Sequence, residues 1–292
     1  MCIPTGGIAF FDSGIGGLTV LDACKKLLPT ENFYYYGDNL RAPYGNLSVD
    51  IIRDYVFEAF EVFQSLSVAA AVIACNTVTA VCIDELRQYY HFPIIGTEPA
   101  VLPAVKDTKG EAFVLTTRAT YQSERFQSLC ARAKKEHPFV RLRLCPCDDL
   151  AGEIERRIED GDADFTELLP SGNPLAVVLG CTHYVYIKEQ IKNYYRCPVY
   201  DGNHGIALRL GSLLEQNRNE NIKNRERKPP GSLFMGDCIQ TTTVDPLQQK
   251  EMKANKCSWS SLPNTTKTSG QIFFIGSGKM RNKTIYERMF AF

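Results

Sequence analysis

The sequence predicts an α/β protein with two pseudo-symmetric, doubly wound parallel-sheet domains and a functional site between them. Short apolar strands alternate with helical segments, and the β-α-β-α order occurs twice along the chain. The apolar runs at 69–74 and 175–179 suit central strands of parallel sheets, which are covered on both faces. A length of 292 residues is enough for two compact domains.

The first half reads as alternating strands and helices. We predict strands at 8–11, 33–36, 69–74 and 94–95. A helix carrying Leu18, Leu21, Leu27 and Leu28 follows the first strand, and Ser48 is a candidate N-cap for a helix that runs to about residue 65. A third helix is predicted at 79–90, where His91-Phe92-Pro93 ends it.

The second half repeats this order after Pro99. We predict strands at 112–115, 140–145, 175–179 and 199–200. A hydroxyl-rich turn at 116–120 opens a helix that runs to about residue 135, and further helices are predicted at 149–160 and 184–194. The repeat indicates a duplication at the scale of a domain.

The remaining chain is predicted to return to the first domain. We expect a helix at 206–217, an irregular or mobile segment at 238–268 that is rich in Thr, Ser, Lys and Gln, and a last strand at 272–275. The predicted domains are therefore residues 1–97, completed by 208–292, and residues 98–207.

Composition excludes several classes of function. Lysine plus arginine is 33 and aspartate plus glutamate is 33, so neither a nucleic acid nor an anionic membrane is expected as a partner. No apolar run reaches the roughly 18 residues of a membrane span, and no signal peptide is recognised. The cysteine count of 11 is odd, which is unlike a disulfide scaffold and predicts a reducing, cytoplasmic setting.

Two cysteines follow the two central apolar strands. Cys75 and Cys181 stand where ligands of open α/β sheets gather, at the carboxyl ends of strands. A single free cysteine is most often a buried hydrophobic residue. Two such cysteines, each followed by polar residues, instead suit removal of a proton from carbon by one thiolate and return of a proton by the opposite thiol. Asp12 could assist Cys75, and His183 and Glu153 could assist Cys181.

Two loops look suited to a small anionic ligand. The turn at 12–17, Asp-Ser-Gly-Ile-Gly-Gly, lies between a strand and a helix, where free backbone N–H groups can face an anion. Its spacing is not that of a dinucleotide or P-loop motif, and its glycines would let a small carboxylate approach the backbone. Tyr44 stands in a turn after the second strand and could contact the substrate.

Four motifs together resemble the aspartate/glutamate racemase family, and the turn at 12–17 is similar to its glutamate racemase branch. The resemblance covers about residues 7–210. The motifs are Phe11–Val20, Tyr36-Gly37-Asp38 with Pro43-Tyr44-Gly45, Ala74-Cys75-Asn76-Thr77, and Leu179-Gly180-Cys181-Thr182-His183.

The resemblance implies cofactor-independent and metal-independent interconversion of L- and D-glutamate, which supplies D-glutamate for peptidoglycan, by a protein that commonly forms homodimers. It implies that Cys75 takes the proton from the D-enantiomer with help from Asp12. Cys181 would take it from the L-enantiomer with help from His183 and Glu153. The substrate-binding residues it implies are Asp12, Ser13, Pro43, Tyr44, Gly45, Asn76, Thr77, Thr117, Thr120, Thr182 and His183.

Other functions stay open at this point. The same mechanism could act on aspartate or another amino acid, and a non-catalytic amino-acid-binding regulator could use the same fold. A decarboxylase would be expected to need only one thiol. A metal site using Cys145, Cys147, Cys181 and His183 lacks the Cys-x₂-Cys spacing of structural zinc sites.

Overall fold

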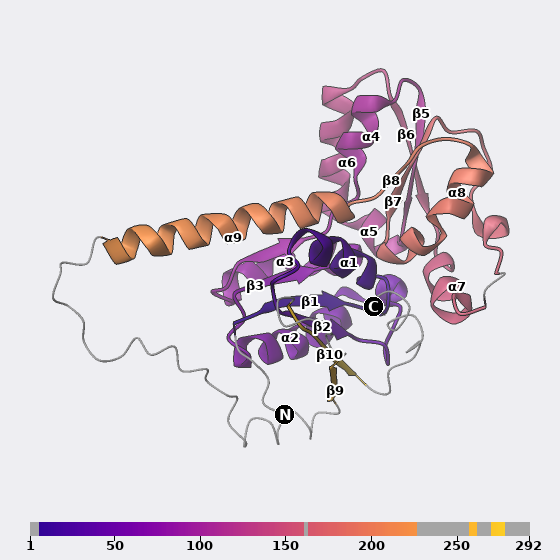
Figure 1. The fold of residues 1–292 in the computed structure, drawn as a ribbon. Helices are drawn as coiled ribbons and strands as arrows, with labels where there is room; N and C mark the ends of the chain where they lie inside the picture. Colours follow the sequence, from indigo (N-terminus) through magenta and orange to yellow (C-terminus); the bar gives the residue numbers. More distant parts are fainter. Residues whose placement is uncertain (1–5, 161–162, 227–256, 262–269, 278–292) are drawn as a thin grey trace.

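The computed structural model describes residues 6–160, 163–226, 257–261 and 270–277. Its strands form a six-stranded sheet in the order β4-β3-β1-β2-β10-β9 and a four-stranded sheet in the order β6-β5-β7-β8 (Figure 1). The pairing of β9 with β10 is antiparallel, and the other strand pairs are parallel. The predicted fold class, two doubly wound parallel sheets, is confirmed.

The first sheet is covered by helices on both faces. It consists of β1 (Ile8–Asp12), β2 (Phe33–Gly37), β3 (Ala70–Ile73), β4 (Ile94–Gly96), β9 (Cys257–Ser261) and β10 (Ile272–Ser277). Phe11 packs on the face of α2 (Val49–Ser65) and α3 (Asn76–Tyr89). Its neighbour Phe10 packs on the face of α1 (Leu18–Leu27) and α9 (Asn203–Glu226). Successive side chains point to opposite faces, so a strand buried on both faces has to be apolar throughout.

The second sheet has the same layered plan. It consists of β5 (Glu111–Thr116), β6 (Arg141–Pro146), β7 (Ala176–Gly180) and β8 (Val199–Tyr200). Helices α4 (Val101–Asp107) and α6 (Glu124–Glu136) cover one face. Helix α7 (Leu150–Arg157), the 3₁₀ helix η3 (Thr182–Ile187) and α8 (Lys188–Tyr195) cover the other. Short helices η1 (Tyr44–Asn46), α5 (Arg118–Gln122) and η2 (Thr166–Leu168) complete the described elements.

Some predicted helices differ from those in the structure. Helix α3 begins at Asn76, directly after Cys75, rather than at residue 79. The helix predicted up to residue 135 is divided into α5 and α6 at Ser123, whose hydroxyl accepts a hydrogen bond from the Phe126 amide at 3.2 Å and caps α6. Helix α4 was not predicted, and α9 continues beyond the predicted end at residue 217.

The polar segment 238–268 lies mostly outside the described residues. Residues 257–261 are described, and they form β9 at the edge of the first sheet, so the expected irregular structure is wrong there. An edge strand of an antiparallel pair does not have to be apolar on both faces, so its polar composition gave no strand signal. The strand predicted at 272–275 is present as β10, and it pairs with β2 of the first sheet. The domain boundaries themselves stay a prediction.

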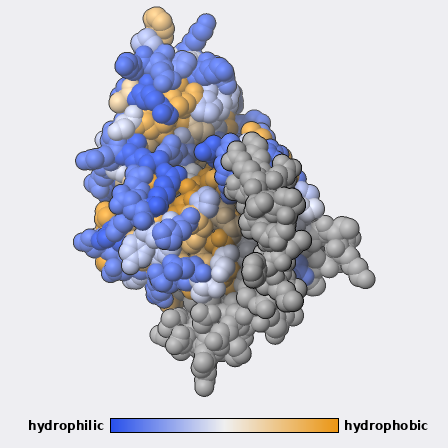
Figure 2. Space-filling view, turned by 90° about the vertical axis from the view of Figure 1, so that its left-hand side faces the viewer, coloured by the Kyte–Doolittle hydropathy of each residue, from blue (hydrophilic) through white to orange (hydrophobic). Residues whose placement is uncertain are grey.

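The described surface is mainly hydrophilic. Hydrophilic residues cover most of the coloured part of Figure 2, and hydrophobic residues appear in limited areas between them. None of the described helices is long and apolar enough to span a membrane.

Candidate active site

The two candidate cysteines lie at equivalent edges of the two sheets. Cys75 follows β3 as the residue before α3, and Cys181 follows β7 as the residue before η3. Both are buried, with 5% and 7% of their surface exposed. They are also close enough for the charge of Cys181 to affect the pKa of Cys75. The structure therefore brings together two thiols that are far apart in the sequence.

Asp12 lies between the two halves of this site. Its Oδ2 accepts a hydrogen bond from the Gly14 amide at 3.0 Å, within the turn that follows β1. Its Oδ1 accepts a hydrogen bond from Thr182 Oγ1 at 3.3 Å, next to Cys181. Burial raises the pKa of Asp12 above its ordinary value, although His183 and the Gly14 amide act in the opposite direction. A carboxyl group with a raised pKa is suited to exchanging a proton.

Cys75 is held as a neutral thiol. Its Sγ donates a hydrogen bond to Ser13 Oγ at 3.6 Å. Burial, and then the Asp12 carboxylate, raise the pKa of Cys75 to about 12, while the Val78 amide and the Ser13 hydroxyl oppose the rise. Cys75 is consequently protonated at neutral pH and can act as an acid.

Cys181 has a basic partner of its own. Its Sγ lies 3.7 Å from His183 Nδ1, and His183 Nε2 lies 2.5 Å from Oε2 of Glu155. Burial disfavours a charged His183, but the Glu155 carboxylate and the Cys181 sulfur outweigh it, so the pKa of His183 is raised well above its ordinary value. An imidazole in contact with the sulfur can exchange a proton with it.

Glu153, which was expected to assist Cys181, is placed elsewhere. Its Oε1 accepts a hydrogen bond from Arg156 Nη2 at 2.5 Å, and its Oε2 lies 3.9 Å from Arg157 Nη1. The carboxylate beside His183 belongs to Glu155. Residues two positions apart point to different sides of a helix, so only one of these two glutamates in α7 can face the site. Residue spacing alone does not tell which one.

Hydroxyl groups from both halves meet at the start of α3, the helix that follows Cys75. Thr77 Oγ1 lies 3.0 Å from Thr117 Oγ1, and Thr117 Oγ1 donates a hydrogen bond to Thr120 Oγ1 at 3.0 Å. Gly45 lies against the same group, since a Cβ at this position would be 3.2 Å from Thr117 Cβ. The side chains of Thr77, Thr117 and Thr120 are buried. Asn76 Oδ1 is also buried and has no hydrogen-bond partner among the described residues, so it is available to a ligand.

Tyr44 is anchored by a polar network, and its predicted contact with the substrate stays a prediction. Its ring is buried, and its hydroxyl donates a short hydrogen bond to Oδ2 of Asp38. Burial, and then Asp38, raise the pKa of Tyr44. Arg41 Nη1 lies 3.3 Å from the same Asp38 oxygen. The hydroxyl is therefore engaged within the protein, and this network fixes the position of Pro43, Tyr44 and Gly45.

Sequence reasoning missed two residues that join the halves. Glu155 is the first, and its contacts are described above. Tyr186 is the second, because its hydroxyl donates a hydrogen bond to the Ile15 carbonyl oxygen at 2.7 Å. The position of Tyr186 in η3, shortly after Cys181, is the only sequence signal that could have pointed to it.

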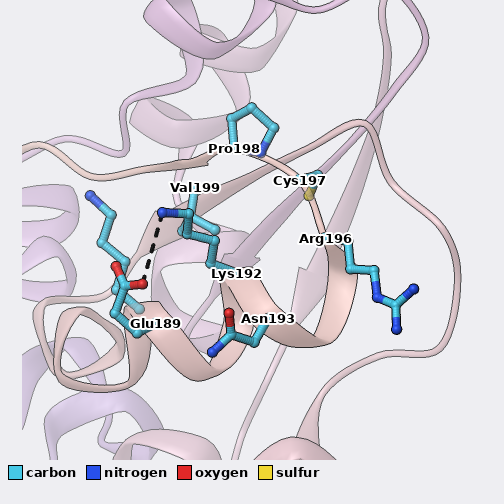
Figure 3. A pocket seen from close by; sticks show the side chains of 8 residues that line it. Glu189, Lys192, Asn193, Arg196, Cys197, Pro198 and Val199 are labelled. Carbon is cyan, nitrogen blue, oxygen red and sulfur yellow. Dashed lines mark ion pairs between the residues drawn. The ribbon is translucent and has the colours of Figure 1, made fainter.

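A cavity of about 870 Å³ on the second half does not contain this site. It lies at the end of α8 and the start of β8 (Figure 3). Lys192 faces Glu189 there, with an N–O distance of 3.8 Å. None of the predicted catalytic or binding residues lines it. Among the described residues, no group of three or more His, Cys, Asp or Glu side chains is arranged to hold a metal ion, so the alternative metal site gains no support.

Comparison with known proteins decides the family. The family model described as Asp/Glu/Hydantoin racemase matches residues 23–209. The chain belongs to this family. The resemblance seen in the motifs is thus confirmed.

Relatives in the racemase family match most of the chain. It is 37% identical over 238 residues to a glutamate racemase of Clostridium acetobutylicum, covering 78% of this chain and 91% of that protein. It is 36% identical over 253 residues to one of Clostridium perfringens, covering 83% and 95%. An Escherichia coli glutamate racemase, solved with L-glutamate and the activator UDP-MurNAc-ala, has a TM-score of 0.65 and 30% identity, covering 73% of this chain and 83% of that one.

Proposed function

We propose that this protein is a glutamate racemase that interconverts L- and D-glutamate by proton transfer between Cα and two cysteines. The main observation that supports this proposal is the pair of buried thiols at the ends of β3 and β7, each of which has an acid–base partner of its own. Cys75 lies beside Ser13 and close to Asp12, and Cys181 lies beside His183. Such a pair can remove a proton from one face of Cα and return one to the other.

The two cysteines act in turn on the substrate. A thiolate at Cys181, which lies beside His183, takes the Cα proton of L-glutamate. Cys75 is a thiol because its pKa is raised to about 12, and it gives its proton to the opposite face. D-glutamate leaves with Cys181 as a thiol and Cys75 as a thiolate. Both return to their starting states by proton exchange with water, through His183 on one side and Asp12 on the other.

The substrate would be held by the polar groups that surround the thiols. The Thr77, Thr117 and Thr120 hydroxyls and the Asn76 amide are suited to the carboxylate oxygens of an amino acid, which accept hydrogen bonds. Ser13, Thr182 and His183 are adjacent to the thiols and would orient Cα. Pro43, Tyr44 and Gly45 would form the wall of the site opposite Thr117.

The relatives support glutamate as the substrate. They are named glutamate racemases, and the Escherichia coli structure contains L-glutamate while one from Francisella tularensis contains D-glutamate. The family description also includes aspartate and hydantoin. A substrate panel that contains these compounds should show a preference for glutamate. D-glutamate would serve peptidoglycan synthesis.

The remaining organisation is proposed on the same basis. We propose a first domain of residues 1–97, completed by 208–292, and a second domain of 98–207. We also propose a homodimer as the working form and a reducing, cytoplasmic setting. The eight cysteines whose side chains the structure describes are free and buried, which suits such a setting.

Replacement of each cysteine tests the mechanism. Cys75→Ser and Cys181→Ser should each reduce racemisation to near the detection limit, because a serine hydroxyl is far less acidic than a thiol. Cys130→Ser is the matched control, since Cys130 is a buried cysteine of α6 outside this site, and it should retain racemisation. If either active-site variant kept most of its activity, that cysteine would be structural and the proposal wrong.

A further inference from the structure

A cationic side chain comes directly after one of the predicted binding residues. Arg118 is the first residue of α5, and it follows Thr117, whose Oγ1 lies 3.0 Å from Thr77 Oγ1 of the first half. The side chain of Arg118 is 54% exposed. Its guanidinium group is therefore open to solvent near the end of β5, close in the chain to the hydroxyls that are proposed to bind the substrate.

Asp148 holds this guanidinium group in place. Arg118 Nη2 donates a short hydrogen bond to Oδ2 of Asp148, which lies between β6 and α7. A guanidinium group carries several N–H donors in a fixed plane. Within the described part of the chain, Asp148 is the only side-chain hydrogen-bond or ion-pair partner of Arg118. The remaining donors are consequently free to bind an anion while Nη2 stays with Asp148.

The segments that carry this ion pair contact a loop of the first half. A Cβ on Gly45 would lie 3.2 Å from the Cβ of Thr117, the residue before the arginine. A Cβ on Gly152, in the first turn of α7, would lie 3.7 Å from Pro43 Cγ. The loop that is proposed to form a wall of the substrate site therefore contacts both the start of α5 and the start of α7.

The predicted binding residues include no lysine or arginine. They offer mainly hydroxyl and amide groups, and their imidazole, that of His183, faces Glu155. Arg41, in the loop after β2, is paired with Asp38. A dicarboxylic amino acid carries a second negative charge, and an arginine fork is suited to bind a carboxylate through parallel hydrogen bonds. Arg118 is thus the arginine with free donors beside the predicted site.

We propose that Arg118, held by Asp148, determines specificity by binding the distal carboxylate of a dicarboxylic amino acid. This proposal deepens the proposed function and rests on it, because the other carboxylate is assigned to the hydroxyls of Thr77, Thr117 and Thr120. Nη2 stays with Asp148, and the other N–H groups of the fork bind the distal carboxylate. An amino acid whose side chain ends in an amide lacks the charge that the fork recognises. Glutamate is thereby preferred over glutamine, which has the same shape.

Loss of Arg118 has a second effect, which comes from Asp148. Oδ1 of Asp148 is buried and has no hydrogen-bond partner among the described residues. Removal of the arginine would therefore leave the charge of this carboxylate unpaired, and that charge would itself repel a dicarboxylic ligand. A double variant, Arg118→Gln with Asp148→Asn, removes both charges together. It should lose the recognition without adding a repulsion.

Equilibrium binding of D-glutamate and D-glutamine is the direct test. Each ligand is titrated by calorimetry into the full-length protein carrying Cys75→Ser, which prevents turnover during the measurement. The preference is the Kd of glutamine divided by the Kd of glutamate. Arg118→Gln and the double variant should each lower it at least about tenfold, the value of a hydrogen bond to a charged group, and most of the change should be in the Kd of glutamate. An unchanged preference in the double variant would overturn the proposal.

Arg132→Gln is the matched control. The Arg132 side chain is 56% exposed, its Nε lies 3.9 Å from Oε1 of Glu136, and it belongs to α6 outside the predicted binding residues. This variant should keep the parent preference, and an equal loss in it would contradict the proposal. Arg118→Lys retains the charge without the fork, so it should keep part of the preference. Circular dichroism would establish that each variant is folded.

The outcome is separable from that of the proposed function. Binding needs no turnover, so a preference for glutamate that depends on Arg118 in a protein that does not racemise glutamate would support the recognition and refute the proposed activity. Racemisation that is lost in Cys181→Ser, together with an unaltered KM for glutamate in Arg118→Gln, would support the activity and refute the recognition.

Discussion

Thr182 donates a hydrogen bond from its Oγ1 to Oδ1 of Asp12 at 3.3 Å. The bond joins the residue after Cys181 to the carboxyl group that raises the pKa of Cys75. It crosses from η3 of the second half to the end of β1 in the first. The groups that we propose to assist Cys75 and Cys181 are thus physically connected.

Asp12 and His183 should nonetheless have opposite directional effects. Asp12→Asn should slow deprotonation of D-glutamate by Cys75 most, and His183→Asn should slow deprotonation of L-glutamate by Cys181 most. General acid–base assistance is worth about 10²–10⁴-fold, so losses in kcat of this size are expected. Equilibrium fixes the ratio of kcat/KM in the two directions, so the asymmetry should appear in kcat and in primary isotope effects with Cα-deuterated substrates. Identical isotope effects in the two variants would contradict the separate assignments.

The threonine hydroxyls should act mainly on substrate binding. Thr77→Val and Thr117→Val remove the hydroxyls that lie 3.0 Å apart across the site. Each variant should raise KM for glutamate about tenfold, because a hydrogen bond to a charged group is worth about 1.5–3 kcal/mol.

Thr116→Val is the control for these two variants. The Thr116 side chain is completely buried in β5 and is not among the predicted binding residues, so this change should leave KM unaltered. An equal rise in KM in the control would show that the effect comes from packing at the end of β5.

The bond between Tyr44 and Asp38 should contribute to stability. Tyr44→Phe deprives the buried Asp38 carboxylate of a hydroxyl donor, and Arg41 remains 3.3 Å away. Loss of one partner of a buried polar group costs about 1–3 kcal/mol, and urea unfolding should show a decrease in this range. Tyr121→Phe in α5 should change stability by less than about 0.5 kcal/mol. A Tyr44→Phe protein as stable as the parent would contradict this account of the network.

The raised pKa of His183 predicts how stability depends on pH. The folded protein binds the His183 proton more tightly than the unfolded chain does, so this contribution is complete below the unfolded pKa of about 6.5. It is lost as the pH rises through the folded pKa. The free energy of unfolding of the parent relative to His183→Asn should consequently fall as the pH rises above about 6.5. A difference that grew with pH would have the wrong sign.

Much of the fold was predictable because strand burial leaves a clear pattern. Phe10 and Phe11 face opposite helix layers, and such a strand is apolar at every position. The same pattern located Cys75 and Cys181, since each follows an apolar strand whose carboxyl end lies at the edge of its sheet. β9 gave no such signal, because it is an edge strand that pairs with β10 through its backbone and does not need apolar side chains at every position.

The glutamate that lies beside His183 could not be chosen from the sequence. Glu153 and Glu155 have the same chemistry and lie in the same helix, and only the packing of α7 decides which one reaches His183. Ile154 between them is completely buried, which places the two carboxylates on different sides of the buried stripe. Similarly, nothing in the sequence indicated that the hydroxyl of Tyr44 would bond to Asp38, because the two residues are six positions apart in a loop.

Deuterium incorporation tests the two-cysteine reaction most directly. The protein is incubated with L-glutamate in D₂O without any added cofactor or metal. At early times the two enantiomers are separated, and the deuterium content of each is measured by mass spectrometry. The D-glutamate formed should carry deuterium at Cα, because Cys75 exchanges its proton with the solvent before it gives it to carbon, while the remaining L-glutamate should still carry hydrogen. D-glutamate that retains hydrogen at Cα, or activity that begins only after pyridoxal phosphate or a metal ion is added, would contradict the mechanism.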